Sequence, residues 1–463
     1  MPEVRCVILA AGQGTRMKSN LPKAMHPLAG RPMVDYVVRA ATAATGERPL
    51  VVVGYGRELV EAALAGRADF VVQKEQLGTG HAAAQAAEKL TGFRGTVVVL
   101  PCDTPLISPR TLADFIATHE RAGAAVTVLT AALEDPSGYG RVIRSADGRV
   151  TAVVEDRDAT PEQRAIREIN TAIYCFDSQT LFAALPRLRR DNAQQEYYLP
   201  DVVELTLADG RPVHAYQAGD PDEVSGVNNR RQQAQAEAVV RRRTMDRLMD
   251  EGVTVVDPET TFIDDTVKVG PDVTVLPFTF ISGESEVGPE CRLGPAADIR
   301  DSRLGRECVV QYSVVEKSAV ADRVTIGPFA HLRADNEVAS DVRVGNYAEI
   351  KNSRVGPGTK ISHHSYIGDA DIGGEVNIGA GVVVVNFDGL RKHRTEIGEG
   401  AFIGCNNNLV APMKVGPGAY TAAGSTLTKD VPADALAVSR ERQQVHLAGW
   451  ARRRREKANK EEP

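Results

Sequence analysis

The second half of the chain carries a six-residue spacing of aliphatic residues, and this spacing restricts the fold more than any other feature. One phase runs from Val269 to Ile299, a second from Val314 to Ile350, and later phases continue to Leu427, often with a glycine directly after the aliphatic residue. A period of six fits neither an α-helix nor simple strand alternation. It is typical of a parallel β-helix, in which each short strand directs one aliphatic residue inward. Stacked coils then bury a core that no single coil could bury.

The spacing is interrupted between Val384 and Ile397 by NFDGLRKHRTE, two polar hexads without an inward aliphatic residue. We predict a loop that protrudes from the solenoid. Loops on a rigid scaffold often carry function because the scaffold fixes their base. The period alone is equally compatible with a tolerated insertion.

The first half of the chain alternates short β-branched runs with helical patterns. Runs such as VRCVILA and GTVVVL are separated by segments such as MVDYVVRAATAA and RTLADFIATHERAG. This alternation predicts a mostly parallel sheet with helices on both faces, in which ligands bind at the carboxyl ends of the strands. The loops at 9–16 and 101–106 follow two of these strands and are therefore expected to border a site.

A charged segment rich in alanine and glutamine separates the two halves. We predict a connecting helix with a solvated face over residues 229–250. The expected organisation is a domain at 1–228, this linker helix, a β-helix domain at 251–440 and a tail at 441–463, since 463 residues exceed the usual size of a single core. The basic run of the tail is expected to be a solvated chain end.

Composition and charge argue against several classes of partner. The formal net charge of −6 disfavours nucleic acid as the main partner. No apolar stretch is long enough to cross a membrane, and the N-terminal segment predicts a strand rather than a secretory signal. The six cysteines are scattered without a Cys-x-x-Cys pair. This argues against a zinc site or a disulfide framework and favours a reducing compartment, so a cytoplasmic protein is expected.

The stretch LAAGQGTRMKSNLPK, from Leu9 to Lys23, predicts a phosphate-binding loop that belongs to neither common class. Met17 stands where the dinucleotide fingerprint needs its third glycine and where the P-loop begins its Gly-Lys-Ser/Thr. The two glycines let backbone N–H groups approach phosphate oxygens, and Arg16 and Lys23 supply positive charge. Standing alone, such a loop would more often be a glycine turn with surface cations.

Further motifs connect this loop to a known family. LAAGQGTRMKSNLPK, QLGTGHA, SGYGRVI, EINTAIY and GVNNR are similar to segments of sugar-nucleotide pyrophosphorylases, and HHSYIGDADIGGEVNIGAG followed by NFDG is similar to one hexapeptide acetyltransferase family. Along nearly its whole length the chain resembles the bacterial bifunctional enzymes that are both N-acetylglucosamine-1-phosphate uridyltransferase and glucosamine-1-phosphate N-acetyltransferase. The resemblance implies an α/β nucleotidyltransferase domain with a Rossmann-like, mostly parallel sheet, followed by a left-handed parallel β-helix of hexapeptide repeats.

The resemblance also implies two reactions. The C-terminal domain would acetylate glucosamine 1-phosphate with acetyl-CoA, and the N-terminal domain would transfer UMP from UTP to N-acetylglucosamine 1-phosphate. The products would be pyrophosphate and UDP-N-acetylglucosamine for cell-wall precursors. Mg²⁺ is the implied cofactor, with UTP and acetyl-CoA as co-substrates. A homotrimer that shares its acetyltransferase sites between subunits is also implied.

For the uridyltransferase site, the resemblance implies that Asp103, after an apolar strand, and Asn228, in GVNNR, hold the magnesium ion. Magnesium usually takes one or two oxygen ligands from protein and the rest from phosphates and water. Gln73 would contact uracil, because an amide can both donate and accept. The implied nucleotide- and sugar-binding positions are Leu9, Ala10, Ala11, Gly12, Arg16, Lys23, Gln73, Gly78, Thr79, Asp103, Gly140, Glu155, Asn170 and Asn228.

For acetyl transfer, the resemblance implies His363 as the catalytic base, since the unperturbed pKa of histidine lies near neutrality. His364 has no counterpart, and adjacent strand residues face opposite sides, so we expect only one of the two to serve. The implied sugar-phosphate-binding positions are Arg333, Lys351, Tyr366, Asn377 and Lys392. The implied acetyl-CoA-binding positions are Ala380, Asn386, Phe387, Cys405, Ala423 and Arg440.

The sequence departs from the family pattern near three of these positions. Pro101 and Cys102 replace Tyr-Gly before the metal-binding aspartate, Phe387 replaces a tyrosine, and Cys405 replaces a serine. The last two changes remove good hydrogen-bond donors. We expect backbone contacts there to survive, and we do not assign Cys405 as a nucleophile.

Two other functions remain open from the sequence. One is a single-activity sugar-1-phosphate nucleotidyltransferase whose β-helix is structural or regulatory, and the other is a non-catalytic β-helix scaffold with a vestigial nucleotide domain. Taken singly, Asp103 would more often cap a turn and His363 would more often be a surface histidine. The segment from His363 to Asp388 argues against the first alternative, and the intact glycine loop with Lys23 and Asp103 argues against the second.

Overall fold

A computed structural model describes residues 3–439 and 448–453 of the chain. The predicted site residue Arg440 lies outside the described residues. The chain divides into two compact units, Met1–Thr244 and Met245–Pro463. Among the helices that the structure describes, none combines the length and the apolar character needed to cross a membrane.

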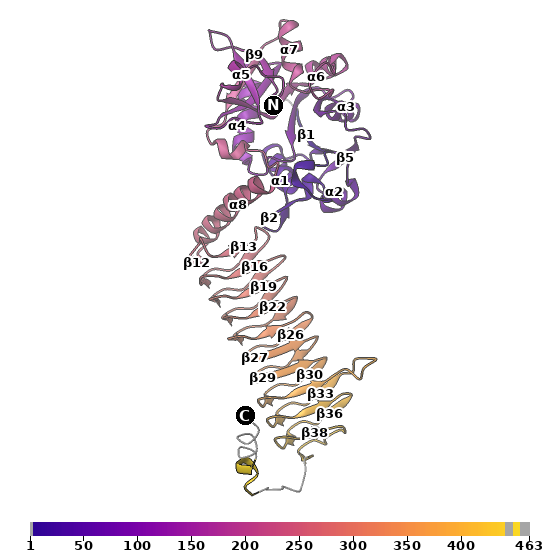
Figure 1. The fold of residues 1–463 in the computed structure, drawn as a ribbon, viewed down its shortest axis with the longest axis vertical. Coiled ribbons are helices and arrows are strands. Elements are labelled where there is room, and N and C mark those ends of the chain that lie inside the picture. Colours follow the sequence, from indigo (N-terminus) through magenta and orange to yellow (C-terminus); the bar gives the residue numbers. More distant parts are fainter. Residues whose placement is uncertain (1–2, 440–447, 454–463) are drawn as a thin grey trace, which may run out of the picture. The chain divides into compact units, whose positions relative to one another are not determined.

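The centre of unit 1 is a mixed sheet in which parallel pairs dominate (Figure 1). Its main strands are β1 (Glu3–Ala10), β4 (Leu50–Val53), β5 (Asp69–Val72), β6 (Gly95–Pro101), β7 (Val126–Ala132), β10 (Glu168–Asp177) and β11 (Val213–Gln217), in the order β11-β7-β10-β6-β1-β4-β5. Only β10 runs antiparallel to both of its neighbours in this order. The hairpin of β8 (Gly140–Arg144) and β9 (Val150–Val154) pairs with β10, and β2 (Pro27–Leu28) pairs with β3 (Arg31–Pro32). The predicted mostly parallel sheet is confirmed.

Helices cover both faces of this sheet because side chains alternate along its strands. Ile8 belongs to a core on the side of α1 (Met33–Thr45) and α4 (Pro109–Ala122). Its neighbour Val7 belongs to a second core on the side of α3 (Thr79–Lys89), α6 (Ser178–Ala184) and α7 (Asp201–Ala208). The helix α4 begins where the Ser108 hydroxyl accepts from the Thr111 N–H, with a proline in the first turn. The helices are α1 (Met33–Thr45), α2 (Arg57–Ala63), α3 (Thr79–Lys89), α4 (Pro109–Ala122), α5 (Pro161–Arg164), α6 (Ser178–Ala184), α7 (Asp201–Ala208) and α8 (Arg230–Asp250), with 3-10 turns at Thr15–Met17, Lys23–Met25, Leu185–Arg187 and Pro221–Val224.

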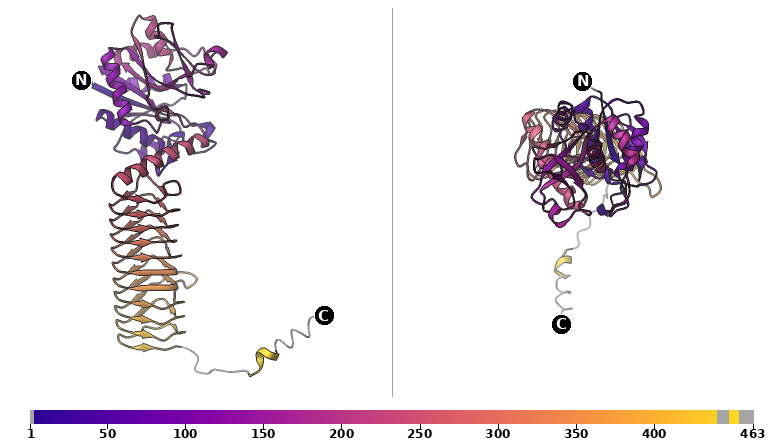
Figure 2. Two further views of the ribbon diagram at one scale, coloured as in Figure 1. Left: turned by 90° about the vertical axis from the view of Figure 1, so that its left-hand side faces the viewer. Right: turned by 90° about the horizontal axis from the view of Figure 1, so that it is seen from above.

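Unit 2 is a left-handed parallel β-helix, as predicted (Figures 1 and 2). One continuous sheet winds through β12 (Thr254–Val255), β13 (Phe262–Ile263), β15 (Thr274–Val275), β16 (Phe280–Ser282), β18 (Arg292–Leu293), β19 (Asp298–Arg300), β21 (Val309–Val310), β22 (Val314–Glu316), β24 (Thr325–Ile326), β25 (His331–Leu332), β27 (Arg343–Lys351), β29 (Lys360–Gly368), β31 (Asn377–Ile378), β32 (Val383–Val385), β34 (Phe402–Ile403), β35 (Asn408–Val410), β37 (Tyr420–Thr421), β38 (Thr426–Leu427) and β39 (Leu436–Ala437).

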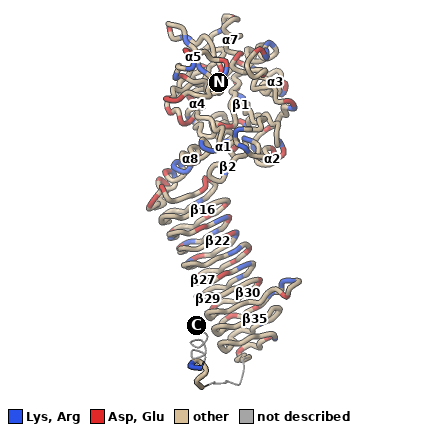
Figure 3. The backbone as a smooth tube through the Cα atoms, in the orientation of Figure 1, with Lys and Arg blue, Asp and Glu red and all other residues tan. Residues whose placement is uncertain are grey.

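A second sheet of unit 2 forms the remaining face of the β-helix. It stacks β14 (Lys268–Val269), β17 (Glu286–Val287), β20 (Arg303–Leu304), β23 (Ser318–Val320), β26 (Asn336–Val338), β28 (Arg354–Val355), β30 (Ala370–Ile372), β33 (Thr395–Ile397) and β36 (Met413–Val415). Several of its outward side chains form ion pairs between neighbouring coils, such as Lys268–Glu286 at 2.7 Å and Lys414–Glu396 at 2.9 Å. Positive and negative side chains are accordingly interspersed along the coils (Figure 3).

The inward aliphatic residues stack directly on one another. Ile361, for example, pairs with Val344 in the coil before it and with Ile378 in the coil after it. One predicted position is wrong, because Val314 is only partly buried whereas Val315 is fully buried and pairs with Leu332. Two five-residue steps, from Val310 to Val315 and on to Val320, shorten the coil here, so counting back by six from Val320 lands one residue too early.

The predicted protruding loop is confirmed. The β30 strand pairs with β33, which leaves the residues after β32 outside the coil, and this segment projects from the β-helix beside β30 and β33 (Figure 1). The loop is internally organised, since the Asp388 carboxylate accepts from the backbone N–H groups of Leu390 and Arg391 and contacts the His393 ring. At its base Arg394 pairs with Asp371 on β30. Hydrogen bonds within the loop therefore define its conformation, and the ion pair anchors its base to the β-helix.

Candidate active sites

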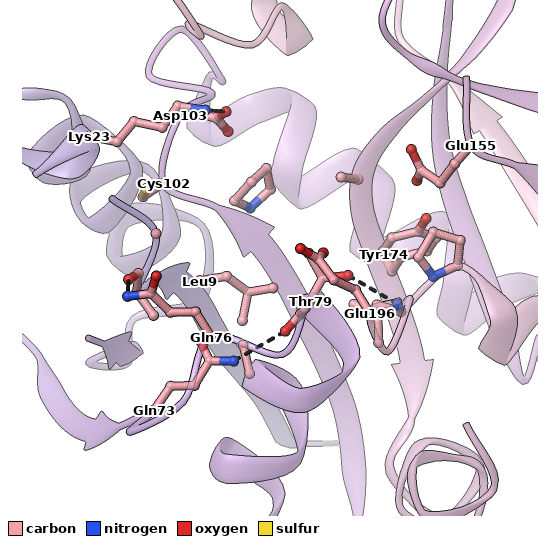
Figure 4. Close-up of a pocket in the computed structure, with 18 residues that line it drawn as sticks. Leu9, Lys23, Gln73, Gln76, Thr79, Cys102, Asp103, Glu155, Tyr174 and Glu196 are labelled. Atoms are coloured by element: carbon pink, nitrogen blue, oxygen red, sulfur yellow. Dashed lines mark hydrogen bonds and ion pairs between the residues drawn. The ribbon is translucent and has the colours of Figure 1, made fainter. Parts of the chain in front are cut away.

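Unit 1 contains a pocket of about 390 Å³ at the carboxyl ends of β1 and β6, the edge where the sequence places a site (Figure 4). Nine of the predicted binding residues line it: Leu9, Ala11, Gly12, Lys23, Gln73, Gly78, Thr79, Asp103 and Glu155. Five others do not line it: Ala10, Arg16, Gly140, Asn170 and Asn228. Ala10 is buried in the hydrophobic core, because alternation turns it away from the pocket-lining residues on either side of it.

The glycine loop brings positive charge to this pocket. Gly14 has a φ of 73°, and a Cβ there would lie 2.6 Å from the Cβ of Lys23. Any larger residue would therefore push Lys23 aside. At Gly12 a Cβ would meet nothing within 4 Å, so the backbone there borders open space. The loop leaves room for a ligand next to its backbone and holds a lysine close by.

Lys23 joins the two predicted metal ligands. Its ammonium contacts the Asp103 carboxylate (Figure 4). It also donates to Asn228 Oδ1 at 2.6 Å. Arg16 Nη2 donates to the same Asn228 oxygen at 2.6 Å. The backbone supports the arrangement, because the Val227 N–H donates to the Asp103 carbonyl at 2.8 Å. Asp103 and Asn228 thus present oxygen atoms to one positively charged group, and a carboxylate and an amide oxygen fit a magnesium ion.

One side of the pocket is built by the segment that follows β5 and by the start of α3. Gln73 is 4 % exposed, and its Nε2 donates to the Gly78 carbonyl at 3.2 Å. Thr79 Oγ1 accepts from the Leu199 N–H at 3.0 Å, which ties α3 to the segment before α7. Gly78 has a φ of 108°, and a Cβ there would lie 2.6 Å from the Tyr197 carbonyl oxygen. Only glycine fits at this contact.

Glu155 lies on the opposite side of the pocket from Gln73 in the view of Figure 4. Burial raises the pKa of its carboxyl to about 7, and nearby carboxylates, led by Asp158, add to the shift. Gly140 and Asn170 are register partners on β8 and β10. Asn170 is buried, and its Oδ1 accepts from the Ala172 N–H at 3.0 Å.

Sequence reasoning missed several residues that line this pocket. Gln76 donates through Nε2 to the Ala11 carbonyl at 3.0 Å and so links the glycine loop to the QLGTG segment. Gln76 lies inside the motif QLGTGHA, so the sequence could have indicated it as a pocket residue. Tyr174 also lines the pocket, and it is the last residue of the quoted segment EINTAIY. Glu196 lines the pocket too, but no local pattern marks it, because the folding of distant segments brings it there.

In unit 2, His363 lies on β29 and is exposed. Its Nδ1 is 3.2 Å from Oδ1 of Asn346, the register partner one coil earlier. An amide oxygen only accepts, so Nδ1 carries the proton and Nε2 is the free basic nitrogen. His364 is exposed as well, which corrects the expectation of strict alternation, because its φ of 35° turns the chain at this point.

Three predicted cationic residues converge in unit 2. The neighbouring Lys392 ammonium, partial burial and the charge of Arg333 together lower the pKa of Lys351. Lys392 belongs to the protruding loop, whereas Lys351 ends β27. Arg333 Nη1 also donates to Glu349 Oε1 at 2.9 Å. Crowded positive charges of this kind fit a phosphate.

Two other predicted positions meet over Gly368. A Cβ at Gly368 would lie 2.6 Å from the Tyr366 hydroxyl and 2.7 Å from Asn386 Nδ2, so a glycine is required for both side chains to occupy these places. Asn386 is 7 % exposed, and its Nδ2 donates to the buried Asp369 carboxylate. Asp369 also accepts from Asn352 Nδ2, so it holds one amide from the coil before it and one from the coil after it.

The remaining predicted positions of unit 2 lie on successive coils. The Ala380 carbonyl accepts from the Asn406 N–H at 2.7 Å, and the Cys405 carbonyl accepts from the Gly424 N–H at 2.8 Å. Cys405 and Ala423 are exposed, Phe387 is 55 % exposed on the protruding loop, and Asn377 is partly buried on β31. The supporting residues Asn346 and Asp369 were missed, although each lies 17 residues, one coil, from the residue that it contacts.

Comparisons with known proteins agree with this arrangement. Residues 6–199 match the model of the MobA-like NTP transferase domain. Bifunctional protein GlmU of Geobacillus thermodenitrificans (strain NG80-2) is 48 % identical over 437 residues, which cover 94 % of this chain and 95 % of that protein. The namesake from Exiguobacterium sp. (strain ATCC BAA-1283 / AT1b) is 49 % identical over 96 % of this chain and 99 % of its own, and that from Brevibacillus brevis (strain 47 / JCM 6285 / NBRC 100599) is 46 % identical over 100 % of both chains.

The chain belongs to the bifunctional GlmU family. The predicted resemblance is therefore confirmed. As a GlmU protein the chain is an enzyme with both uridyltransferase and acetyltransferase activity. This overturns the two alternatives left open by the sequence, a single-activity nucleotidyltransferase and a non-catalytic scaffold.

Proposed function

We propose that unit 2 transfers the acetyl group of acetyl-CoA to the amine of glucosamine 1-phosphate, and that unit 1 transfers UMP from UTP to the N-acetylglucosamine 1-phosphate so formed. The observation that carries the proposal is the grouping of charge at each place. Lys23, Asp103 and Asn228 meet beside the glycine loop, and Arg333, Lys351 and Lys392 converge in the β-helix.

In the acetyl transfer, the amine must lose a proton before it attacks the thioester carbonyl. His363 is the proposed base, because Asn346 holds the proton on Nδ1 and leaves Nε2 to accept. Arg333, Lys351 and Lys392 would bind the sugar phosphate, and Tyr366 and Asn377 would bind hydroxyl groups. Ala380, Asn386, Phe387, Cys405, Ala423 and Arg440 are the proposed acetyl-CoA contacts, Arg440 on the basis of family resemblance alone.

In the uridyl transfer, an oxygen of the sugar phosphate attacks the α-phosphorus of UTP, and pyrophosphate leaves. This reaction asks the protein mainly to position and neutralise polyanions. Lys23 and Arg16 supply the charge, and the backbone around Gly12 can approach the phosphates. Asp103 and Asn228 would hold Mg²⁺, which when bound neutralises phosphate oxygens. Glu155, with Gly140 and Asn170, is assigned to the sugar, and Gln73, Gly78 and Thr79 to the base.

We further infer a homotrimer in the cytoplasm that shares its acetyltransferase sites between subunits. Support comes from a ladder of aromatic rings on successive coils, in which Phe329 lies 5.7 Å from Tyr312 and 5.6 Å from Tyr347 between ring centroids. All three rings are about half exposed, as expected of a surface that another subunit covers. All six cysteines are free thiols, which suits a reducing compartment. If sedimentation at active concentrations shows monomers and no larger species, the trimer is refuted.

Product analysis by mass spectrometry tests the proposed reactions. The chain is incubated with glucosamine 1-phosphate, acetyl-CoA, UTP and Mg²⁺. We expect N-acetylglucosamine 1-phosphate to appear first and to be converted to UDP-N-acetylglucosamine with release of pyrophosphate. Formation of UDP-glucosamine without the acetylated sugar phosphate, or acetylation without any nucleotide transfer, would refute the proposed sequence.

A further inference from the structure

The side-chain amide of Gln73 is held in one orientation inside the pocket of unit 1. Its Nε2 group has two hydrogens, and two acceptors lie within reach: the Gly78 carbonyl at 3.2 Å and Nδ1 of His81 at 3.0 Å. A carbonyl cannot donate, so the nitrogen of the amide must face Gly78. Oε1 is the only part of the amide left for a ligand, and among the described residues no donor contacts it.

His81 is as important for this orientation as Gly78. The Gly78 carbonyl also accepts from the Ala82 N–H at 3.1 Å, as the first bond of α3, so it does not depend on Gln73 for a partner. His81 Nδ1 must accept from Gln73, and the ring is therefore neutral with its proton on Nε2. The ring centroid lies 6.3 Å from that of Tyr197. The Gln85 amide nitrogen is 3.4 Å from Nε2, on the side of the ring away from Gln73, and forms no hydrogen bond with a protonated Nε2, since both groups are donors.

We propose that His81 is a positioning residue that sets the nucleobase preference of the uridyltransferase site. By taking up the second Nε2 hydrogen, it leaves Gln73 able only to accept from the base. Uracil and thymine present a donor at N3, whereas cytosine presents an acceptor there. A freely rotating glutamine would serve both, but a fixed acceptor selects imide bases and leaves cytosine with two facing acceptors.

This inference rests on the proposed function, in which Gln73 meets the base of UTP. It changes one detail of the expectation from the sequence, where the amide was predicted both to donate and to accept. In the structure both donor hydrogens are committed to the protein. Selectivity then comes from a residue that does not itself need to touch the nucleotide.

The test compares UTP with CTP as nucleotide donor in the full-length chain. In His81→Leu, which offers no acceptor, we expect the ratio of kcat/KM for UTP to that for CTP to fall by about tenfold or more. His81→Asn offers an amide oxygen to Gln73 and is expected to retain most of the preference. Gln85→Ala removes a contact of the ring on its other side without touching Gln73, and serves as the matched control with a near-wild-type ratio.

Thermal unfolding of the same samples, followed by circular dichroism, reports whether unit 1 of each variant is folded. An unchanged UTP:CTP ratio in His81→Leu overturns the inference, as does an equal loss of preference in Gln85→Ala. If His81→Leu transfers neither nucleotide, the ratio of UTP to CTP dissociation constants, measured by calorimetry, decides by the same criterion. A wild-type chain that transfers no nucleotide from UTP would instead refute the proposed function itself.

Discussion

The two units build their sites in opposite ways. Unit 1 gathers loops from distant parts of the sequence around a pocket that buries Gln73 and raises the pKa of Glu155 to about 7. Unit 2 places His363 and Lys392 on the exposed surface of a regular solenoid, and its charged groups are crowded rather than buried. A pocket can tune a group through desolvation, whereas a solenoid tunes it mainly through its neighbours on adjacent coils.

The largest effect is expected from a substitution in unit 2 that abolishes one activity and spares the other. His363→Ala removes the proposed base, so we expect the rate of acetyl transfer to fall roughly 10³-fold. Uridyl transfer from UTP to N-acetylglucosamine 1-phosphate should stay within twofold of wild type, roughly the scatter of such assays. Thiol release from acetyl-CoA and pyrophosphate release measure the two reactions separately. Retention of acetyl transfer would remove His363 from its assigned role.

The reciprocal change acts on unit 1. Asp103→Asn keeps the shape of the side chain but removes the negative charge that Lys23 and a magnesium ion would share. We expect metal-dependent uridyl transfer to fall by about 10²- to 10³-fold, with acetyl transfer unaffected. A titration of the rate with Mg²⁺ checks the assignment, because the variant should need a higher metal concentration. A variant with wild-type metal dependence would contradict it.

Gly14→Ala tests how closely the glycine loop must hold Lys23. A Cβ at position 14 would lie 2.6 Å from the Lys23 Cβ, and the φ of 73° adds strain. Displacement of Lys23 should lower kcat/KM for UTP by about 10- to 100-fold. Gly219→Ala is the matched control, since a Cβ there meets nothing within 4 Å and its φ lies outside the strained range. Equal effects of both variants would contradict a specific role of Gly14.

A smaller effect concerns the pH dependence that desolvation creates in unit 1. The pKa of Glu155 is raised to about 7, so its carboxyl is mainly protonated at pH 6 and mainly ionised at pH 8. An ionised carboxylate accepts a stronger hydrogen bond from a sugar hydroxyl. We therefore expect KM for N-acetylglucosamine 1-phosphate to rise about threefold from pH 8 to pH 6.

The matched variant for this titration is Glu155→Gln, which cannot ionise. Its KM profile should report only the ionisation of the substrate phosphate, so the difference between the two profiles isolates Glu155. Superimposable profiles would show that this carboxyl does not contribute to sugar binding.

The smallest effect is expected on the exposed side of unit 2. Phe387→Tyr restores the hydroxyl that the family pattern contains, but the ring is 55 % exposed and sits on the protruding loop. We expect KM for acetyl-CoA to change by no more than about twofold, because an exposed hydroxyl exchanges one hydrogen bond with water for another. Steady-state kinetics at varied acetyl-CoA check this. A tenfold decrease in KM for acetyl-CoA would mean that this loop is more enclosed in the working enzyme.

The same contrast explains how much could be predicted from the sequence. Contacts in the β-helix are periodic, so the stack of coils, the inward residues and the protruding loop followed from spacing, with an error only at Val314 where the coil shortens. The coil length would also have paired Asn346 with His363. In unit 1 the sheet and the site-bearing edge could be predicted, but the approach of Asn228 to Asp103, or of Glu196 to the pocket, depends on tertiary folding that no local pattern encodes.

The central claim is that two independent sites in one chain act in sequence, and mixing two variants tests it most directly. His363→Ala and Asp103→Asn are purified separately and each is given glucosamine 1-phosphate, acetyl-CoA, UTP and Mg²⁺. Neither variant alone should make appreciable UDP-N-acetylglucosamine, whereas the mixture should restore it, because N-acetylglucosamine 1-phosphate released by one variant is used by the other. Failure of the mixture to form the product, or its efficient formation by either variant alone, would contradict the account.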